Sequence, residues 1–500
     1  MLNESRKALF ITIGLILGLI MSSLDQTIVS SAMPTIVNQL DGMTLYSWGF
    51  SIYMLVSTTA MPIYGKLADL FGRKKVYLIG LTLFLIGSVL CGVAGSMEQF
   101  IVYRAIHGLG AGALMPIAFT IIGDVYPPEK RGKFMGLFGT VFAVSSLLGP
   151  TLGGAIAEHW GWGWIFLINL PLGIAAFLFI YVSLRESRNG ENRSIDWLGA
   201  ASFTGAIVSI LLALILIGND QGSRSHYSWD SSIILILLGA GSMLLIFFSW
   251  IETKAKDPFI PLRLFKIRVI AYGNIAGFFM SAAMFGAIVY IPLFVQGVIG
   301  VNPTLAGFIL TPLLLSVVVT TTIGGRLLAK VSYRAILVPS LLLMGVGFYF
   351  LSRMNADTSE IEAIAYMVVT GLGMGAVYPT LGTAAQSAVD IADRGTATSS
   401  SQFFRSIGGT IGVSVFGSIL AIRMDIQSAG ASGGFVDQRL LLDAETRGAL
   451  TGAVLSDLQS RLSESLGLVF EIGMILIVFA CIACLMIGNA RLVQRNRKEA

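Results

Sequence analysis

The sequence predicts an all-α integral membrane protein, and three observations support that fold class. Of the 500 residues, 55% are hydrophobic and only 12% are charged, whereas soluble domains carry about 25% charged residues. Apolar runs long enough to cross a bilayer recur from one end of the chain to the other. All 7 tryptophans lie at the ends of these runs, where amphipathic rings meet the membrane interface. A water-soluble globule is therefore excluded.

The apolar runs define the predicted membrane spans. A span needs about 20 largely apolar residues, and fourteen runs meet that length. They cover residues 8–32, 46–64, 76–95, 99–123, 134–157, 164–184, 198–217, 232–251, 270–296, 304–329, 334–352, 361–386, 401–422 and 466–488. The first run is too long for a signal peptide and lacks an A-x-A cleavage pattern, so it is predicted to stay as the first helix.

The basic residues orient these spans. If the N-terminus is cytoplasmic, the loops on that side and the two tails contain most of the 33 Lys and Arg residues, and the positive-inside rule favours this orientation. Both termini are then cytoplasmic, and the long loop 423–465 is outside. The net charge of +5 is too small and too interleaved to indicate nucleic acid as a partner.

An internal repeat organises the spans into two halves. At an offset of 263 residues, the pattern G-L-G-x-G-A-x-x-P that begins at Gly108 recurs at Gly371. Small residues at this spacing also serve close helix packing in any membrane bundle. Parallel six-helix repeats are typical of secondary transporters. We therefore predict two six-helix bundles plus two inserted helices, with boundaries at 1–184, 185–268 and 269–500.

The turn between the second and third spans carries a specific motif. Its pattern is G-x-x-x-D-x-x-G-R-K-K, with the residues Gly65, Asp69, Gly72 and Arg73. A basic turn of this kind can simply fix topology. Alternatively, Asp69 can pair with Arg73 one turn away or face a helix N-terminus of the other half. The motif resembles that of the major facilitator superfamily, which implies the major facilitator fold.

Further motifs resemble the fourteen-helix drug:proton antiporters of that superfamily. The sequence L-D-x-T-I-V around Asp25 and R-x-x-H-G from Arg104 are similar to their motifs in the first and fourth spans, with His107 where glutamine is usual. The fifth span has their G-P-x-x-G-G motif, formed by Gly149, Pro150, Gly153 and Gly154. Pro150 is expected to bend that span, either to seal one side of a conduit or as a tolerated kink.

Two opposite charges stand inside apolar spans of the first half. Asp25 lies near or beyond the middle of the first span, and Arg104 lies at a similar depth in the fourth. Such charges cost several kcal/mol unless paired or protonated. The second repeat has no charged counterpart, since Met367 aligns with Arg104. This asymmetry favours a proton-coupling site, although a purely structural ion pair stays an alternative.

Two other ionisable residues are weaker candidates. His107 lies on the same helical face as Arg104, three residues away. It can relay protons or act as a neutral hydrogen-bonding group in place of glutamine. Glu471, a secondary acid in the last span, can reach water by snorkelling.

Taken with the resemblance, these features predict a multidrug efflux transporter that exchanges protons for lipophilic compounds across the plasma membrane. No nucleotide-binding loop, metal-ligand cluster or catalytic set appears, so we expect neither an enzyme nor a cofactor. Expected partners are small lipophilic substrates, protons and membrane lipids, with a monomer as the working unit. An exporter of an endogenous lipid or metabolite, or a proton–solute symporter, stays an alternative. Candidate substrate contacts are Met21, Tyr290, Phe294 and Tyr378.

Overall fold

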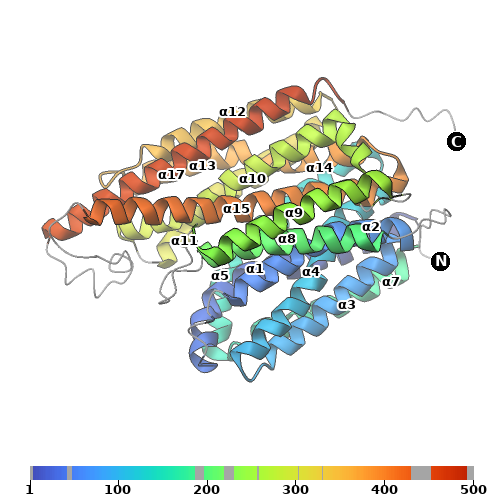
Figure 1. Cartoon of the computed structure of the whole chain (residues 1–500), viewed down its shortest axis with the longest axis horizontal. Coiled ribbons are helices and arrows are strands. Elements are labelled where there is room, and N and C mark those ends of the chain that lie inside the picture. Colours follow the sequence, from blue (N-terminus) through green and yellow to red (C-terminus); the bar gives the residue numbers. More distant parts are fainter. Residues whose placement is uncertain are drawn as a thin grey trace. The chain divides into compact units, whose positions relative to one another are not determined.

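A computed structural model of the chain is shown in Figure 1. The structure describes residues 4–41, 45, 48–185, 196–218, 230–255, 258, 260–301, 303–328, 330–429 and 452–491. Every regular element in these ranges is helical. The prediction of an all-α chain is therefore confirmed for the described part.

The helices follow the order of the apolar runs. Their bounds are α1 (Glu4–Gln39), α2 (Trp48–Phe71), α3 (Arg73–Gly92), α4 (Met97–Val125), α5 (Pro128–His159), α6 (Trp164–Leu167), α7 (Asn169–Ser183), α8 (Trp197–Gly218), α9 (Ser232–Lys254), η2 (Leu262–Lys266), α10 (Arg268–Phe294), η3 (Val295–Ile299), α11 (Pro303–Leu327), α12 (Tyr333–Ser352), α13 (Glu360–Gly375), α14 (Val377–Ser387), η4 (Ile391–Asp393), α15 (Arg394–Ala429) and α17 (Gly452–Met486).

Twelve helical segments among the described residues are long and apolar enough to span a membrane. The expected spans 46–64 and 134–157 coincide with α2 and α5, which are not among the twelve. In α2, the polar residues Thr58, Thr59, Lys66 and Asp69 are buried inside the protein, so this helix has less need of an apolar surface. The count of fourteen spans stays a prediction.

Several helices continue beyond the apolar runs. The expected outer loop 423–465 is helical at both ends, because α15 extends to Ala429 and α17 begins at Gly452. Hydropathy marks only the apolar middle of a helix, whereas backbone hydrogen bonding continues it into polar sequence. Residues 430–451 of this loop lie outside the described residues.

The chain forms two compact units. Unit 1 contains residues 1–273, 381–403 and 491–500, and unit 2 contains residues 274–380 and 404–490. Unit 1 therefore includes the inserted helices and a short stretch of the second repeat that runs into α15. The boundaries predicted from the sequence, at 184 and 268, stay a prediction.

The glycine pattern of the repeat is explained by close helix packing. In unit 1, a Cβ at Gly108 would meet the carbonyl oxygen of Tyr53 on α2, and one at Gly110 would meet the backbone of Phe84 on α3. In unit 2, a Cβ at Gly371 would meet the carbonyl oxygen of Leu313 on α11, and one at Gly373 would meet the backbone of Met344 on α12. Both repeats therefore use the same glycines to bring three helices together.

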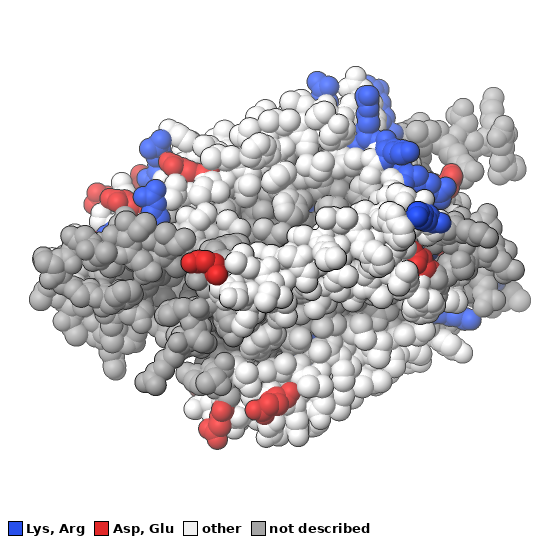
Figure 2. All heavy atoms as spheres, in the orientation of Figure 1, with Lys and Arg blue, Asp and Glu red and all other residues white. Residues whose placement is uncertain are grey.

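The surface supports a membrane location. Exposed large hydrophobic side chains occur along most helices, and α9 carries several of them, including Met243 and Ile246. Figure 2 shows the charged side chains near helix ends, with uncharged side chains covering the helix flanks. A surface of this kind suits lipid rather than water. The inserted helices α8 and α9 pack against each other, and α8 also contacts α2.

Candidate functional site

The centre of the candidate site is an ion pair buried in unit 1. The Nη1 atom of Arg104 on α4 donates to Oδ2 of Asp25 on α1 at 2.7 Å. Both side chains are at most 1% exposed. The Asp25–Arg104 pair expected from the sequence is therefore present, while its role in proton coupling stays a prediction.

Helix α2 supplies two further contacts of Arg104. The Nε atom donates to the carbonyl oxygen of Gly49 at 3.1 Å. The Tyr53 ring lies one turn further along α2, with its centroid 4.1 Å from the guanidinium carbon. Neither residue was predicted from the sequence. Tyr53 is a single aromatic in an apolar span, and only the closeness of α2 to α4 at Gly108 brings it over the cation.

His107 completes the group, which we call the charged cluster (Asp25, Arg104, His107 and Tyr53). Its Nδ1 atom lies 3.2 Å from Nη1 of Arg104 and 3.7 Å from Oδ1 of Asp25. Because a guanidinium only donates hydrogen bonds, Nδ1 must accept, which leaves the proton of a neutral imidazole on Nε2. The geometry therefore favours the neutral hydrogen-bonding alternative over a protonated histidine.

The two oxygens of the Asp25 carboxylate have different partners. Its Oδ2 atom holds Arg104, whereas Oδ1 has no hydrogen-bond partner among the described residues. A buried acid is costly in a membrane span unless it is paired or protonated, and its role in proton coupling stays a prediction.

A second polar cluster lies where α2 ends and α3 begins. Gly72 has a φ of 96°, a left-handed conformation that glycine adopts without strain, and it separates the two helices. Arg73 then points back so that its Nη2 lies 3.2 Å from Oδ1 of Asp69, one turn before it. The local pairing expected from the motif spacing is present.

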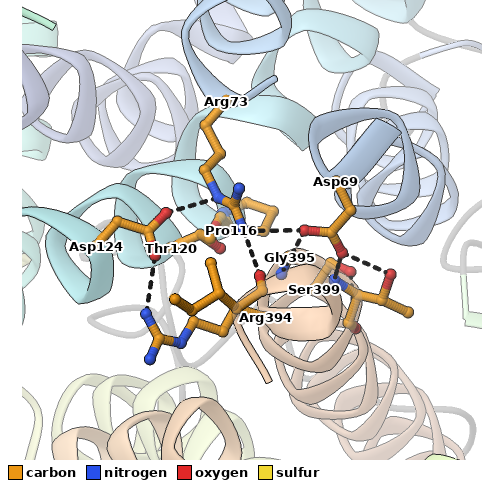
Figure 3. Close-up of polar contacts among 10 residues, drawn as sticks. Asp69, Arg73, Pro116, Thr120, Asp124, Arg394, Gly395 and Ser399 are labelled. Atoms are coloured by element: carbon orange, nitrogen blue, oxygen red, sulfur yellow. Dashed lines mark hydrogen bonds and ion pairs between the residues drawn. The ribbon is translucent and has the colours of Figure 1, made fainter. Parts of the chain in front are cut away.

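Asp69 also binds the start of α15 (Figure 3). Its carboxylate accepts hydrogen bonds from the backbone N–H groups of Gly395 and Thr396, at 3.0 and 2.8 Å, and from the Thr396 hydroxyl at 2.9 Å. The first N–H groups of a helix lack partners within the helix and favour an anion. Both alternatives for Asp69, the local pair and the helix N-terminus, therefore occur together.

Two arginines and Asp124 extend this contact, which we call the α2–α15 junction. Asp124 on α4 forms an ion pair with Arg73, whose Nε lies 2.7 Å from Oδ2, and accepts a hydrogen bond from Arg394 Nη1 at 3.1 Å. Arg73 Nη2 also donates to the carbonyl oxygen of Ile391 at 2.8 Å. Burial raises the pKa of the Asp69 carboxyl to about 6, although Arg73 and the Thr396 and Gly395 donors oppose this rise. Arg73 and these donors favour the ionised form of the carboxyl.

Glycines allow these helices to approach closely. A Cβ at Gly65 would meet the Ser399 hydroxyl of α15, so the motif glycine is needed at the junction. On α5, a Cβ at Gly149 would meet Thr27, which belongs to the motif around Asp25. Gly153 is buried, whereas a Cβ at Gly154 would meet nothing within 4 Å. The Pro150 side chain lies outside the described part, so its predicted bend stays a prediction.

The candidate substrate contacts fall in different units. Met21 is fully buried in the hydrophobic core of unit 1. In unit 2, Tyr290 donates to the carbonyl oxygen of Val413 at 3.0 Å, Phe294 is 1% exposed, and Tyr378 lies with its ring centroid 5.0 Å from the Arg405 guanidinium. Glu471 on α17 is half-buried. The binding roles of these residues stay predictions.

Comparison with known proteins agrees with this architecture. Residues 15–413 match the model of the Major Facilitator Superfamily. The multidrug transporter protein MdtP of Bacillus subtilis (strain 168) is 37% identical, covering 99% of this chain and 96% of that protein. Multidrug resistance protein 3 of the same strain is 39% identical, covering 96% and 95%.

Solved structures of low sequence identity share the fold. The human organic anion transporter MFSD10 matches with a TM-score of 0.62 at 15% identity, covering 95% of this chain and 100% of that chain. The proton:xylose symporter XylE matches with a TM-score of 0.62 at 15% identity, covering 95% of both. By its sequence and its helical architecture, the chain belongs to the major facilitator superfamily, a family of membrane transporters rather than enzymes.

Proposed function

We propose that this protein is a proton-coupled antiporter that exports lipophilic drugs or similar amphiphiles across the plasma membrane. The observation that carries the proposal is the buried Asp25–Arg104 pair, because the second repeat has the uncharged Met367 where the first repeat has Arg104. The transmembrane potential supplies about 2.3 kcal/mol per charge per 100 mV. Exchange of one proton is therefore enough to drive a useful concentration gradient.

In the proposed transport cycle, the charged cluster and the α2–α15 junction have different roles. Asp25 loads and releases the proton, and the α2–α15 junction holds one arrangement of the helices. Release of the junction then allows the two six-helix halves to rock between an inward-open and an outward-open form. Relatives that are named as multidrug transporters support drugs as the substrate class.

Other cargoes stay open as alternatives. The same fold occurs in a proton:xylose symporter and in an organic anion transporter, so fold alone separates neither the direction of coupling nor the substrate. An endogenous lipid or metabolite would use the same site. The direction of proton movement during substrate transport distinguishes the antiporter from a symporter.

We expect the substrate charge to be limited by the single carboxylate of the charged cluster. One carboxylate balances one positive charge, and a second charge in a dry site costs several kcal/mol. Cells that produce the protein should accumulate less of a monocationic lipophilic dye, and an uncoupler should abolish the difference. A dicationic dye of similar size should be exported at least 10-fold more slowly. Equal, uncoupler-sensitive export of the dication would show that a second acid takes part, with Glu471 the first to test.

The proposed orientation can be tested with introduced cysteines. Ala356 lies in the exposed turn between α12 and α13, and Lys75 is exposed near the start of α3. With both termini cytoplasmic, Ala356→Cys should react with a membrane-impermeant maleimide in intact cells, and Lys75→Cys only after lysis. The unsubstituted protein measures the background from Cys91, Cys481 and Cys484. The reverse labelling pattern would invert the topology.

A further inference from the structure

The Tyr53 ring is the closest aromatic partner of Arg104 among the described residues. Its centroid lies 4.1 Å from the guanidinium carbon, compared with 5.9 Å for the Phe166 ring. Tyr53 is 1% exposed, so water does not compete for the cation. The face of an aromatic ring attracts a cation at this distance, and more strongly in a desolvated site. Arg104 thus has an uncharged partner beside the Asp25 carboxylate.

Comparison of the two repeats relates the Tyr53 ring to the Arg104 cation. Gly108 packs on the carbonyl of Tyr53, and its counterpart Gly371 packs on the carbonyl of Leu313. Leu313 is therefore the structural counterpart of Tyr53, just as Met367 aligns with Arg104. At these aligned positions, the ring and the cation occur together in one repeat and are both absent from the other.

Protonation of Asp25 changes which contacts hold Arg104. While the carboxylate is charged, the ion pair at 2.7 Å dominates. Once Asp25 is protonated, the guanidinium keeps the Gly49 carbonyl, the His107 Nδ1 atom and the Tyr53 ring. A buried cation without its anion is strongly unfavourable. These remaining contacts therefore matter more to the proton-loaded state than to the charged one.

We propose that Tyr53 is a positioning residue whose ring holds the Arg104 guanidinium while Asp25 carries the proton, and thereby sets the pH at which Asp25 loads. This inference rests on the proposed proton-coupled function. The other titratable groups facing the set are His107 on α4 and Cys91 on α3, while α6 contributes the Phe166 ring. Among the described side chains these neighbours add no further carboxylate.

The test compares two substitutions of Tyr53 in proteoliposomes. Tyr53→Leu introduces the residue of the second repeat and removes the ring, whereas Tyr53→Phe removes only the hydroxyl. Without the ring, the state with Asp25 protonated is disfavoured. The pH midpoint of proton-driven exchange should therefore move about one unit towards acid, which corresponds to a tenfold weaker proton affinity. Tyr53→Phe keeps the ring over Arg104 and removes only a hydroxyl that faces Asp25, so it should shift the midpoint less than Tyr53→Leu does. An alkaline shift in Tyr53→Leu, or an equal shift in Tyr53→Phe, would overturn the proposal.

Three controls separate this role from general packing. Arg104→Ala should shift the midpoint towards alkaline pH, because the loss of a nearby cation favours a protonated carboxyl. Adding Tyr53→Leu to Arg104→Ala should cause no further shift, and a further acid shift would contradict the proposal. Tyr77→Leu removes an equally buried ring from α3 and should leave the midpoint in place. If Asp25→Asn still couples to protons, the proposed function itself fails, whatever Tyr53 does.

Discussion

Asp25→Asn is expected to abolish proton-driven export while leaving substrate exchange down a gradient intact. An amide cannot cycle a proton, and in the structure Asp25 is the carboxylate that touches Arg104. We expect the proton-driven rate in proteoliposomes to fall at least 100-fold. The measurement is drug-induced proton release, recorded beside substrate counterflow in the same vesicles. Proton release equal to that of the wild type would show that another group couples.

A double substitution keeps this test free from folding defects. Asp25→Asn leaves Arg104 buried without its anion, which costs about 3–5 kcal/mol when one partner of a buried pair is removed. Asp25→Asn combined with Arg104→Met makes the site neutral and introduces the residue that the second repeat has at Met367. This variant should insert normally and still lack coupling. Normal coupling in it would establish the alternative of a merely structural ion pair.

Asp69→Asn is expected to have the second largest effect, because it weakens the α2–α15 junction. The carboxylate accepts three hydrogen bonds from the first turn of α15 and pairs with Arg73. Hydrogen bonds to a charged group contribute about 1.5–3 kcal/mol each, and an amide places a donor against other donors. We expect transport to fall roughly 10-fold or more, with substrate affinity retained.

Opening of the junction can be measured directly. Ser399 is 1% exposed and lies against Gly65, so a cysteine introduced as Ser399→Cys should be labelled faster when Asp69→Asn is also present. The matched control is Asp393→Asn, which breaks an ion pair to Arg263; the arginine side chain is 65% exposed and the aspartate side chain 13% exposed. Ion pairs that water reaches on one side are weakened, so this control should change labelling less than Asp69→Asn does. Unchanged labelling in Asp69→Asn would mean that Asp69 does not hold the junction.

The sequence alone was enough to predict an all-α membrane protein of the major facilitator fold, because apolar runs, tryptophan positions and repeated glycines depend on the bilayer and on close helix packing. It also identified Asp25 and Arg104, since charges inside apolar runs are costly and therefore stand out. The helix ends were less predictable. Hydropathy does not register the polar turns that backbone hydrogen bonds add to α15 and α17.

Only the tertiary structure decided which groups meet. From the sequence, the partner of Asp69 could be either Arg73 or a helix N-terminus. The close crossing of α2 and α15 at Gly65 places both partners within hydrogen-bonding distance of Asp69. For Asp124, no local signal indicated that it joins Arg73 to Arg394, 270 residues later in the chain. Tyr53 carries no charge to mark it in an apolar span. Its role depends on a ring lying over a cation from another helix, and that closeness is a property of helix packing, not of local sequence.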